Sequence, residues 1–367
     1  MREARRILHR LYCLLGSNMH ADIQNVFTPA YAIEDAYRFA GRQDQLDRVS
    51  MALQSRGTQI VIYGNRGVGK SSLARQLAGL ARGDQIIIDR LRIKPHEIPD
   101  WLVINLECDD TIPDIKSLIL RLLTDDTALA PWIPFKVEKS TNTNEVTGGL
   151  QVKLINISGK HSENLTLGKE EAKGDLYSTF SNAIMHIIES GVAQSGVLFI
   201  IDEIDRVASR TELASFIRSR ASDDRVKFAL VGVGTTPQEL ILNHESIVRQ
   251  ISDGCVEMPP MNDAELKQIF DNAHRELADD GISFSENAQQ WIISVAKGHP
   301  YYVHLLGKHS LISAVMSNEK NVTLEMSQAA LAEIAIKGTA RIQETTYAKA
   351  IGHSYKREYI LKELSLV

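Results

Sequence analysis

Short apolar runs alternate along this chain with segments in which apolar residues recur at helical spacing. Four runs lack the polar alternation of a half-exposed strand, and they occupy residues 59–63, 102–106, 197–201 and 228–233. Such runs are typical of parallel strands that helices cover on both faces. Leucines spaced three or four positions apart follow the first run, as expected of a helix. The pattern predicts an α/β core built on a parallel sheet.

A purely helical pattern fills the part of the chain after the core. Three helical segments follow one another there without intervening strands, at residues 262–279, 285–296 and 301–315. They begin directly after Pro259 and Pro260, and prolines commonly mark the boundary of an element. We therefore predict a core over residues 39–258 and a small helical domain over residues 259–340.

Residues 131–173 interrupt the pattern of the core. Serine, threonine and asparagine dominate residues 140–144, and Leu150, Val152 and Leu154 then alternate with other side chains. Alternation at period two is typical of a half-buried strand, whereas the polar stretch is typical of a loop. We interpret this segment as an insertion that is part mobile loop and part hairpin.

Both ends of the chain are predicted to lie outside these two domains. We interpret residues 1–38 as an N-terminal extension or linker, because His9 and Arg10 leave no apolar run long enough for a targeting signal. Residues 341–367 combine basic side chains with apolar residues at helical spacing. They are either the opening helix of a winged-helix module or a capping helix on the second domain.

The composition limits the classes of partner. A length of 367 residues is enough for roughly two domains with a substantial core. The 41 basic and 46 acidic side chains leave a net charge of -5, which provides no global positive field to attract nucleic acid. A local basic patch would still allow nucleic acid to bind, so that class of partner stays open.

The cysteines and the hydropathy pattern indicate an intracellular setting. Cys13, Cys108 and Cys255 lie far apart without a CxxC spacing, which argues against a disulfide framework and against a zinc site. No apolar stretch approaches the ~18 residues that a membrane span requires. We expect a cytoplasmic protein with no membrane partner.

One segment matches the pattern of a phosphate-binding loop in full. Its glycines allow backbone conformations that turn successive N–H groups inward, and the following helix N-terminus adds to this anion site. Lys70 would bridge the β- and γ-phosphates of a nucleotide, and Ser71 would place its hydroxyl on Mg²⁺. The predicted nucleotide-binding residues here are Gly64, Asn65, Arg66, Gly67, Val68, Gly69, Lys70, Ser71 and Ser72.

Two carboxylates follow the third apolar run, at the end where open α/β sheets bind ligands. Asp202 is predicted to hold Mg²⁺ through water, because magnesium keeps much of its hydration shell. Glu203 is predicted to orient and deprotonate an attacking water molecule. We expect Asp205 to cap the helix that follows.

The chain lacks motifs that mark neighbouring classes of nucleotide hydrolase. We find no Asn/Thr-Lys-x-Asp motif, which reads guanine, and no Leu-Ser-Gly-Gly-Gln motif shortly before Asp202. The predicted ligands are therefore ATP and Mg²⁺.

Two further motifs resemble those of STAND ATPases and of origin-recognition-type AAA+ proteins. Residues 39–45, Phe-Ala-Gly-Arg-Gln-Asp-Gln, resemble their apolar-apolar-Gly-Arg-Glu-x-Glu box, with Gln43 and Gln45 in place of its acids. Residues 298–300, Gly-His-Pro, are similar to the Gly-x-Pro motif of STAND lids. With the phosphate loop and the acidic pair, four ordered motifs carry the resemblance.

This resemblance implies a three-layer P-loop NTPase core with a parallel sheet and a small helical lid domain. It also implies a nucleotide contact from Pro300 of the lid and a γ-phosphate sensor at Thr236. Thr236 is equally well explained as a cap or turn residue before Pro237.

AAA+ sites commonly receive an arginine from a neighbouring subunit, because a cation stabilises charge on the transferring phosphoryl group. Arg249 is the first candidate for this trans-acting residue, and Arg218 and Arg220 are alternatives. Solvated surface roles explain each of them equally well. The resemblance therefore implies a homo-oligomer.

Three functions stay open at this point. The first is a Mg-dependent ATP hydrolase that acts as an oligomeric regulatory switch in signalling or antiviral defence, for a separate effector protein. We expect a separate effector because no nuclease motif or protease triad is recognisable here. The second is a DNA-binding initiator or transposition-type loader. The third is a nucleotide-binding scaffold with little turnover.

Overall fold

The computed structural model describes residues 23, 25–94, 97–139, 152–156, 176–220, 223–241 and 247–335. The chain divides into two compact units, one formed by Ala32–Met261 and the other by the chain on either side of it. The predicted C-terminal helix over residues 341–367 lies outside the described residues. Within the described part of the chain, no helix is both long and apolar enough to cross a membrane.

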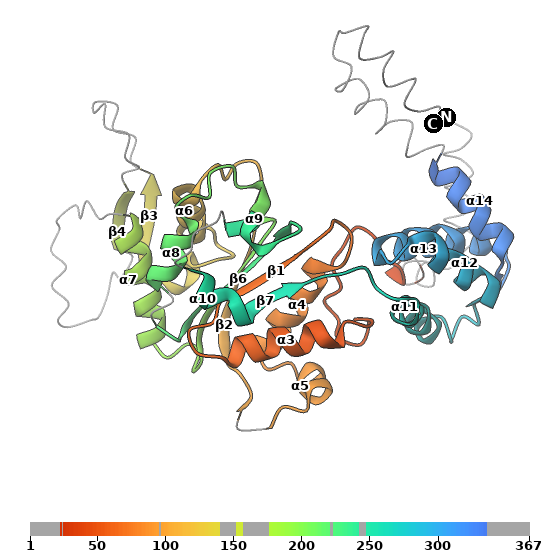
Figure 1. Ribbon diagram of the computed structural model, residues 1–367, viewed down its shortest axis with the longest axis horizontal. Helices are drawn as coiled ribbons and strands as arrows, with labels where there is room; N and C mark the ends of the chain where they lie inside the picture. The colour runs from red at the N-terminus through yellow and green to blue at the C-terminus, as the bar shows by residue number, and fades with distance from the viewer. Residues whose placement is uncertain are drawn as a thin grey trace, which may run out of the picture. The chain divides into compact units, whose positions relative to one another are not determined.

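A parallel five-stranded sheet forms the centre of the first unit, with strand order β2-β5-β6-β1-β7 (Figure 1). Its strands are β1 (Ile60–Gly64), β2 (Trp101–Glu107), β5 (Gly196–Asp202), β6 (Val226–Val233) and β7 (Cys255–Glu257). The predicted α/β fold with a parallel sheet is confirmed. Strand β7 was not predicted, since three residues are too few to produce a recognisable pattern.

Helices cover both faces of this sheet and complete the three layers. They are α3 (Gln43–Gln54), α4 (Lys70–Ala81), α5 (Gln85–Leu91), α6 (Ile115–Thr124), α7 (Leu176–Glu189), α8 (Leu213–Arg220), α9 (Pro237–Ile241) and α10 (Val248–Ile251). Alternate strand residues face opposite sides. Ile60 and Ile62 pack in the cluster with α3 and α4, whereas Val61 packs in the cluster with α6, α7 and α8. This double burial explains why the strands are apolar throughout.

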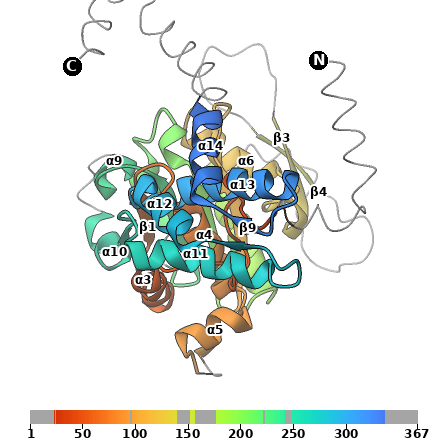
Figure 2. The same ribbon diagram turned by 90° about the vertical axis from the view of Figure 1, so that its right-hand side faces the viewer.

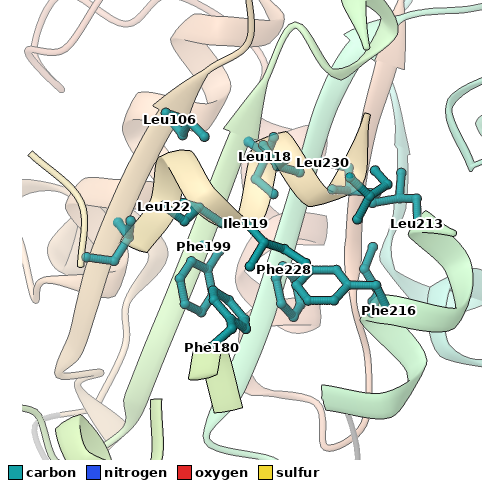
Figure 3. Close-up of a cluster of buried hydrophobic side chains, with 14 of the residues drawn as sticks. Leu106, Leu118, Ile119, Leu122, Phe180, Phe199, Leu213, Phe216, Phe228 and Leu230 are labelled. Carbon is teal, nitrogen blue, oxygen red and sulfur yellow. The ribbon is translucent and has the colours of Figure 1, made fainter. Parts of the chain in front are cut away.

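Aromatic rings fill the cluster on the α6, α7 and α8 side (Figure 3). Phe199 and Phe228, on neighbouring strands, stack with ring centroids 5.1 Å apart. Phe180 of α7 contacts Phe199 at 5.4 Å, and Phe216 of α8 contacts Phe228 at 5.6 Å. These contacts fasten α7 to β5, which ends at Asp202, and α8 to the neighbouring strand β6.

The predicted insertion contains a β-hairpin. Strands β3 (Phe135–Lys139) and β4 (Val152–Asn156) pair antiparallel, with Phe135 opposite Asn156 and Lys139 opposite Val152. The rest of residues 140–173 lies outside the described residues.

The second unit is helical and forms the predicted helical domain. Its helices are α11 (Asp263–Glu276), α12 (Glu286–Ala296), α13 (Pro300–Met316) and α14 (Leu324–Ile334), which Figure 2 shows gathered together. Asn262 and Glu265 form a capping box at the start of α11. Two-residue strands β8 (Ser283–Phe284) and β9 (Asn321–Val322) also pair in parallel, which the sequence did not predict.

Phe27 completes the core of this second unit, although the sequence assigned residues 1–38 to an extension or linker. The Phe27 ring is fully buried and contacts the rings of Phe284 and His304 at 5.5 and 5.9 Å. A Cβ added at Gly307 would lie 2.6 Å from this ring, so the glycine on α13 leaves the room that Phe27 occupies. A single buried aromatic leaves no periodic signal, which is why the sequence did not reveal it.

Lys227 is a buried cation in the core of the first unit. Its Nζ donates to the carbonyls of Ala52, Ser55 and Thr58 at 3.3, 2.6 and 3.0 Å. Burial lowers the pKa of Lys227 to about 8, so the ammonium is charged at neutral pH. Lys227 therefore ties the C-terminal end of α3 and the loop before β1 to strand β6.

We predict that Lys227→Met lowers the free energy of unfolding by about 2–3 kcal/mol, because three carbonyls lose their shared donor. Urea denaturation at pH 7 measures this change. The control is Lys94→Met, an exposed lysine, for which we expect a change within about 0.5 kcal/mol. Equal stability of the two variants would show that other groups satisfy these carbonyls.

Candidate functional site

Three strand ends meet at one edge of the sheet in the first unit. Gly64 at the end of β1 pairs with Val233 at the end of β6. Asp202 ends β5, which pairs with β6 on its other side. Since all these strands run in parallel, the loops that follow them emerge side by side. The sheet therefore brings together the predicted phosphate loop, the acidic pair and the predicted sensor.

The phosphate loop has the backbone that its glycines predict. Gly64, Gly67 and Gly69 all have positive φ, of 149°, 79° and 96°. At Gly64 a Cβ would lie 2.6 Å from the carbonyl oxygen of Met258, so glycine is also required for close packing. Helix α4 begins at Lys70, directly after Gly69. The loop therefore leads into a helix N-terminus, where backbone N–H groups can bind an anion.

The side chains of the loop divide into three kinds. Asn65 and Arg66 are exposed, whereas Val68 is buried in the core and only its backbone can face a ligand. Lys70 lies against the loop, with its Nζ 3.1 Å from the Gly64 carbonyl and 2.8 Å from the Asn65 carbonyl. Burial lowers the pKa of Lys70, while the charges of Asp202 and Asp205 oppose that shift. The Lys70 ammonium is thus held against the first two residues of the loop.

Ser71 and Asp202 provide oxygen ligands of the kind that magnesium prefers. The Asp202 carboxylate accepts hydrogen bonds from the Ser71 side chain and, at 2.8 Å, from the Glu203 backbone N–H. Burial raises the pKa of Asp202, and the two hydrogen bonds partly offset this effect. A hydroxyl in contact with a half-buried carboxylate beside a phosphate-binding loop is a donor set that fits Mg²⁺ with a nucleotide.

Glu203 lies beside Asp202 but is engaged in an ion pair. Its backbone has a φ of 52°, in the left-handed region. The Glu203 Oε2 accepts from Arg206 Nη1 at 2.8 Å, and Arg206 Nη2 donates to Asp110 Oδ1 at 3.1 Å. The carboxylate is thus held by a cation in this arrangement.

A segment before α3 supports the phosphate loop. The buried Arg42 donates from Nη2 to the Val68 carbonyl at 2.9 Å. Arg90 of α5 donates to the carbonyls of Phe39 and Gly41 at 3.0 and 2.7 Å, and to Gln43 Oε1 at 2.9 Å. Arg90 therefore fixes residues 39–43, and Arg42 joins this segment to the phosphate loop. The sequence motif identified this segment, but not these contacts.

Ser72 has a structural contact that the sequence did not predict. Its hydroxyl accepts from the Ile33 backbone N–H at 3.0 Å. Four residues later, Gln76 Nε2 donates to the carbonyls of Ile33 and Glu34 at 2.9 and 3.0 Å. The Ser72 side chain thus fastens the segment around Ile33 to helix α4, and only its backbone N–H stays a predicted ligand of phosphate.

Comparison with known proteins agrees with this arrangement. A family model for the AAA ATPase domain matches residues 38–231, which are more than half of the chain. The chain belongs to the AAA ATPase family. The resemblance to P-loop AAA+ proteins is therefore confirmed. No curated protein matches the sequence.

Several solved structures share the fold of this AAA ATPase. A Walker-type ATPase of Pyrococcus abyssi has a TM-score of 0.52 and 15% identity, over 89% of this chain and 81% of that one. The Orc1 protein of Aeropyrum pernix, in complex with DNA, has a TM-score of 0.50 and 16% identity, over 89% and 74%. Cdc6p of Pyrobaculum aerophilum has a TM-score of 0.50 and 15% identity, over 82% and 68%. At these identities the likeness concerns the fold alone.

The predicted sensor of the AAA ATPase lies just beyond β6. The Gly234 N–H donates to the Gly64 carbonyl at 3.5 Å, so this segment borders the phosphate loop. The Thr235 N–H and hydroxyl both donate to Glu239, and the Thr236 hydroxyl approaches the same carboxylate at 3.5 Å. Both threonines are exposed. The sensor role of Thr236 stays a prediction.

The remaining predicted residues occupy separate elements. Arg249 is exposed on α10 and Arg218 is exposed on α8, whereas Arg220 is half-buried and donates to the Ser181 hydroxyl. Pro300 is the first residue of α13, in the helical unit. The trans-acting role of Arg249 and the nucleotide contact of Pro300 stay predictions.

Asp205 does not cap a helix, so that expectation is wrong. It belongs to the short 3-10 turn η3 (Ile204–Arg206), and the next helix begins only at Leu213. Its Oδ1 instead accepts from the Val233 N–H at 2.8 Å. A contact between residues 28 positions apart leaves no local signal in a sequence.

We predict that Arg206→Gln raises ATP turnover about two- to fivefold, because a carboxylate freed from an arginine is a stronger base. The limit follows from the ~1 kcal/mol that a solvent-exposed pair contributes. Phosphate release at saturating ATP measures the change. The control is Arg121→Gln, which removes an exposed pair with Asp125 outside the site. A fall in turnover specific to Arg206→Gln would show that Arg206 assists the reaction instead.

Proposed function

We propose that this AAA ATPase is a Mg²⁺-dependent ATP hydrolase that acts as an oligomeric, nucleotide-driven switch for a partner protein. One observation carries the proposal. The loop with Lys70 and Ser71 lies at the same sheet edge as the carboxylates of Asp202 and Glu203. These are the groups that phosphoryl transfer to water requires.

Each of these residues would have a separate task. The loop N–H groups and the Lys70 ammonium would bind the β- and γ-phosphates. Ser71 and Asp202 would hold Mg²⁺, which neutralises phosphate charge when it is bound. Glu203, once released from Arg206, would accept a proton from the attacking water molecule. In its ion pair with Arg206, it is a poorer base.

The switch requires that ATP and ADP favour different states of the protein. Thr236 and Pro300 are proposed to make contacts that depend on the nucleotide. Arg249 is proposed to reach the site of a neighbouring subunit, which would couple assembly to ATP. A separate effector in the cytoplasm, in signalling or defence, would receive the output.

We predict that the wild-type protein grows to a defined oligomer with Mg-ATP and not with Mg-ADP. Lys70→Ala should stay at the ADP mass, because it loses the cation that binds the phosphates. Glu203→Gln should bind ATP, keep the larger mass and hydrolyse at least about a hundredfold more slowly. Light scattering and phosphate release measure these outcomes.

Two results would contradict this proposal. An unchanged mass in all nucleotide states would exclude a self-assembling switch. Equal hydrolysis by wild-type protein and Glu203→Gln, with ATP binding intact, would favour the scaffold with little turnover.

A DNA-binding initiator or loader is the second candidate, because the similar Orc1 protein of Aeropyrum pernix was solved in complex with DNA. The net charge of -5 weighs against it. We predict only non-specific affinity for duplex DNA, with Kd above about 1 μM at physiological salt and no dependence on ATP. Fluorescence anisotropy over a salt series measures this. Nanomolar binding that requires ATP and falls steeply with salt would make the initiator the better assignment.

A further inference from the structure

Asp205 joins two segments that ATP hydrolysis must coordinate. It lies in turn η3, two residues after Glu203. Its Oδ1 accepts from the backbone N–H of Val233, the last residue of β6, at 2.8 Å. Charged acceptors make hydrogen bonds that are shorter and stronger than neutral ones. The end of β6 is therefore tied to the segment that carries Glu203.

The neighbouring strand residue leaves room for this carboxylate. A Cβ added at Gly232 would lie 2.7 Å from Asp205 Oδ1, 2.8 Å from Leu240 Cδ2 and 3.1 Å from Ile204 Cγ2. Gly232 does not have the positive φ that would require glycine for its backbone. Glycine is needed at this position for space, part of which Asp205 occupies.

Val233 lies between the phosphate loop and the segment with the predicted sensor. It pairs with Gly64, the first residue of the phosphate loop. The next residue, Gly234, donates to the Gly64 carbonyl, and Thr235 and Thr236 follow. A displacement of Val233 would therefore move the start of the Thr235–Thr236 segment. It would also disturb the bond from Gly234 to the phosphate loop.

Asp205 also contributes charge close to the phosphate-binding lysine. The carboxylates of Asp202, Asp205 and Glu203 all raise the pKa of Lys70 against the effect of burial, and Asp205 does so more than Glu203. Asp205 thus combines a hydrogen bond that fixes geometry with a negative charge near Lys70. Asparagine keeps an acceptor oxygen but removes the charge, so substitution can separate the two contributions.

We propose that Asp205 is a positioning residue for ATP hydrolysis, which holds the Glu203 segment and the Thr235–Thr236 segment in one arrangement through its bond to Val233. This inference rests on the proposed function. Asp205 itself would touch neither the nucleotide nor the attacking water. Its effect would be to fix the position of Glu203 relative to the Thr235–Thr236 segment, which would contact the γ-phosphate.

The test compares Asp205→Ala, Asp205→Asn and Gly232→Ala in the full chain, by phosphate release and by the affinities for ATP and ADP. We expect Asp205→Ala and Gly232→Ala to lower kcat about tenfold or more. Their affinity for ATP relative to ADP should fall about threefold, because the segment near the γ-phosphate is displaced. Asp205→Asn should restore both quantities to within about twofold of wild type.

The matched control is Asp224→Ala. Asp224 lies just before the start of β6, at the end away from the site. It makes a similar long-range bond, in which its Oδ1 accepts from the Gly57 N–H at 2.9 Å. Its loss should leave kcat and the affinity ratio unchanged. Thermal unfolding of every variant identifies a fold defect, and the two Asp205 variants decide the matter if Gly232→Ala does not fold.

Two outcomes would overturn the proposal. Wild-type behaviour of Asp205→Ala would show that the bond is dispensable. A loss in Asp205→Asn as large as that in Asp205→Ala would show that the charge matters rather than the bond. Failure of the proposed function is distinguishable, because wild-type protein would then bind ATP without hydrolysis, and the ATP-to-ADP affinity ratio would still test the contact of Asp205.

Discussion

The position of strand β1 between β6 and β7 is the constraint on which the site depends. Parallel pairing on both sides fixes the register of β1, so that Gly64 lies opposite Val233 and within close packing distance of Met258. A side chain at Gly64 would separate these strands or displace the loop. Because the strand is buried on both faces, it has little freedom to slip. The sheet thus determines where the phosphate loop begins, before any residue of the loop contributes.

Three long polar side chains then fix the phosphate loop and two neighbouring segments of the chain. Arg42 binds the Val68 carbonyl, Arg90 binds two carbonyls of residues 39–41, and Gln76 binds two carbonyls of residues 33–34. All of these bonds join segments far apart in sequence and use backbone acceptors. A buried carbonyl that loses such a donor costs about 1–3 kcal/mol, which makes the arrangement hard to loosen one bond at a time. The loop is therefore preorganised for an anion, while Glu203 is held in an exposed ion pair that is easier to open.

The contrast between these features explains what the sequence could predict. The phosphate loop and the Asp202–Glu203 pair depend on residues adjacent in sequence, so spacing alone identified them. Asp205 could not be assigned correctly, since its partner Val233 is on another strand. Burial of Phe27 against Gly307 joins positions 280 residues apart and has no periodicity to reveal it. Strand β7 is recognisable only through its pairing with β1. The local motifs were recognisable in the sequence, whereas the contacts that position their residues arise from tertiary packing.

Gln43 illustrates how packing accommodates a departure from a family motif. It stands where the resembling box has an acid, and its Oε1 still accepts from Arg90 Nε at 2.9 Å. Its Nε2 donates to Asp47 Oδ1 at 3.0 Å, one helical turn further along α3. A glutamate could serve Arg90 but would place a second negative charge against Asp47, and like charges at this spacing destabilise a helix. The amide satisfies both neighbours at once, so the support beneath the phosphate loop is preserved although the acid of the motif is missing.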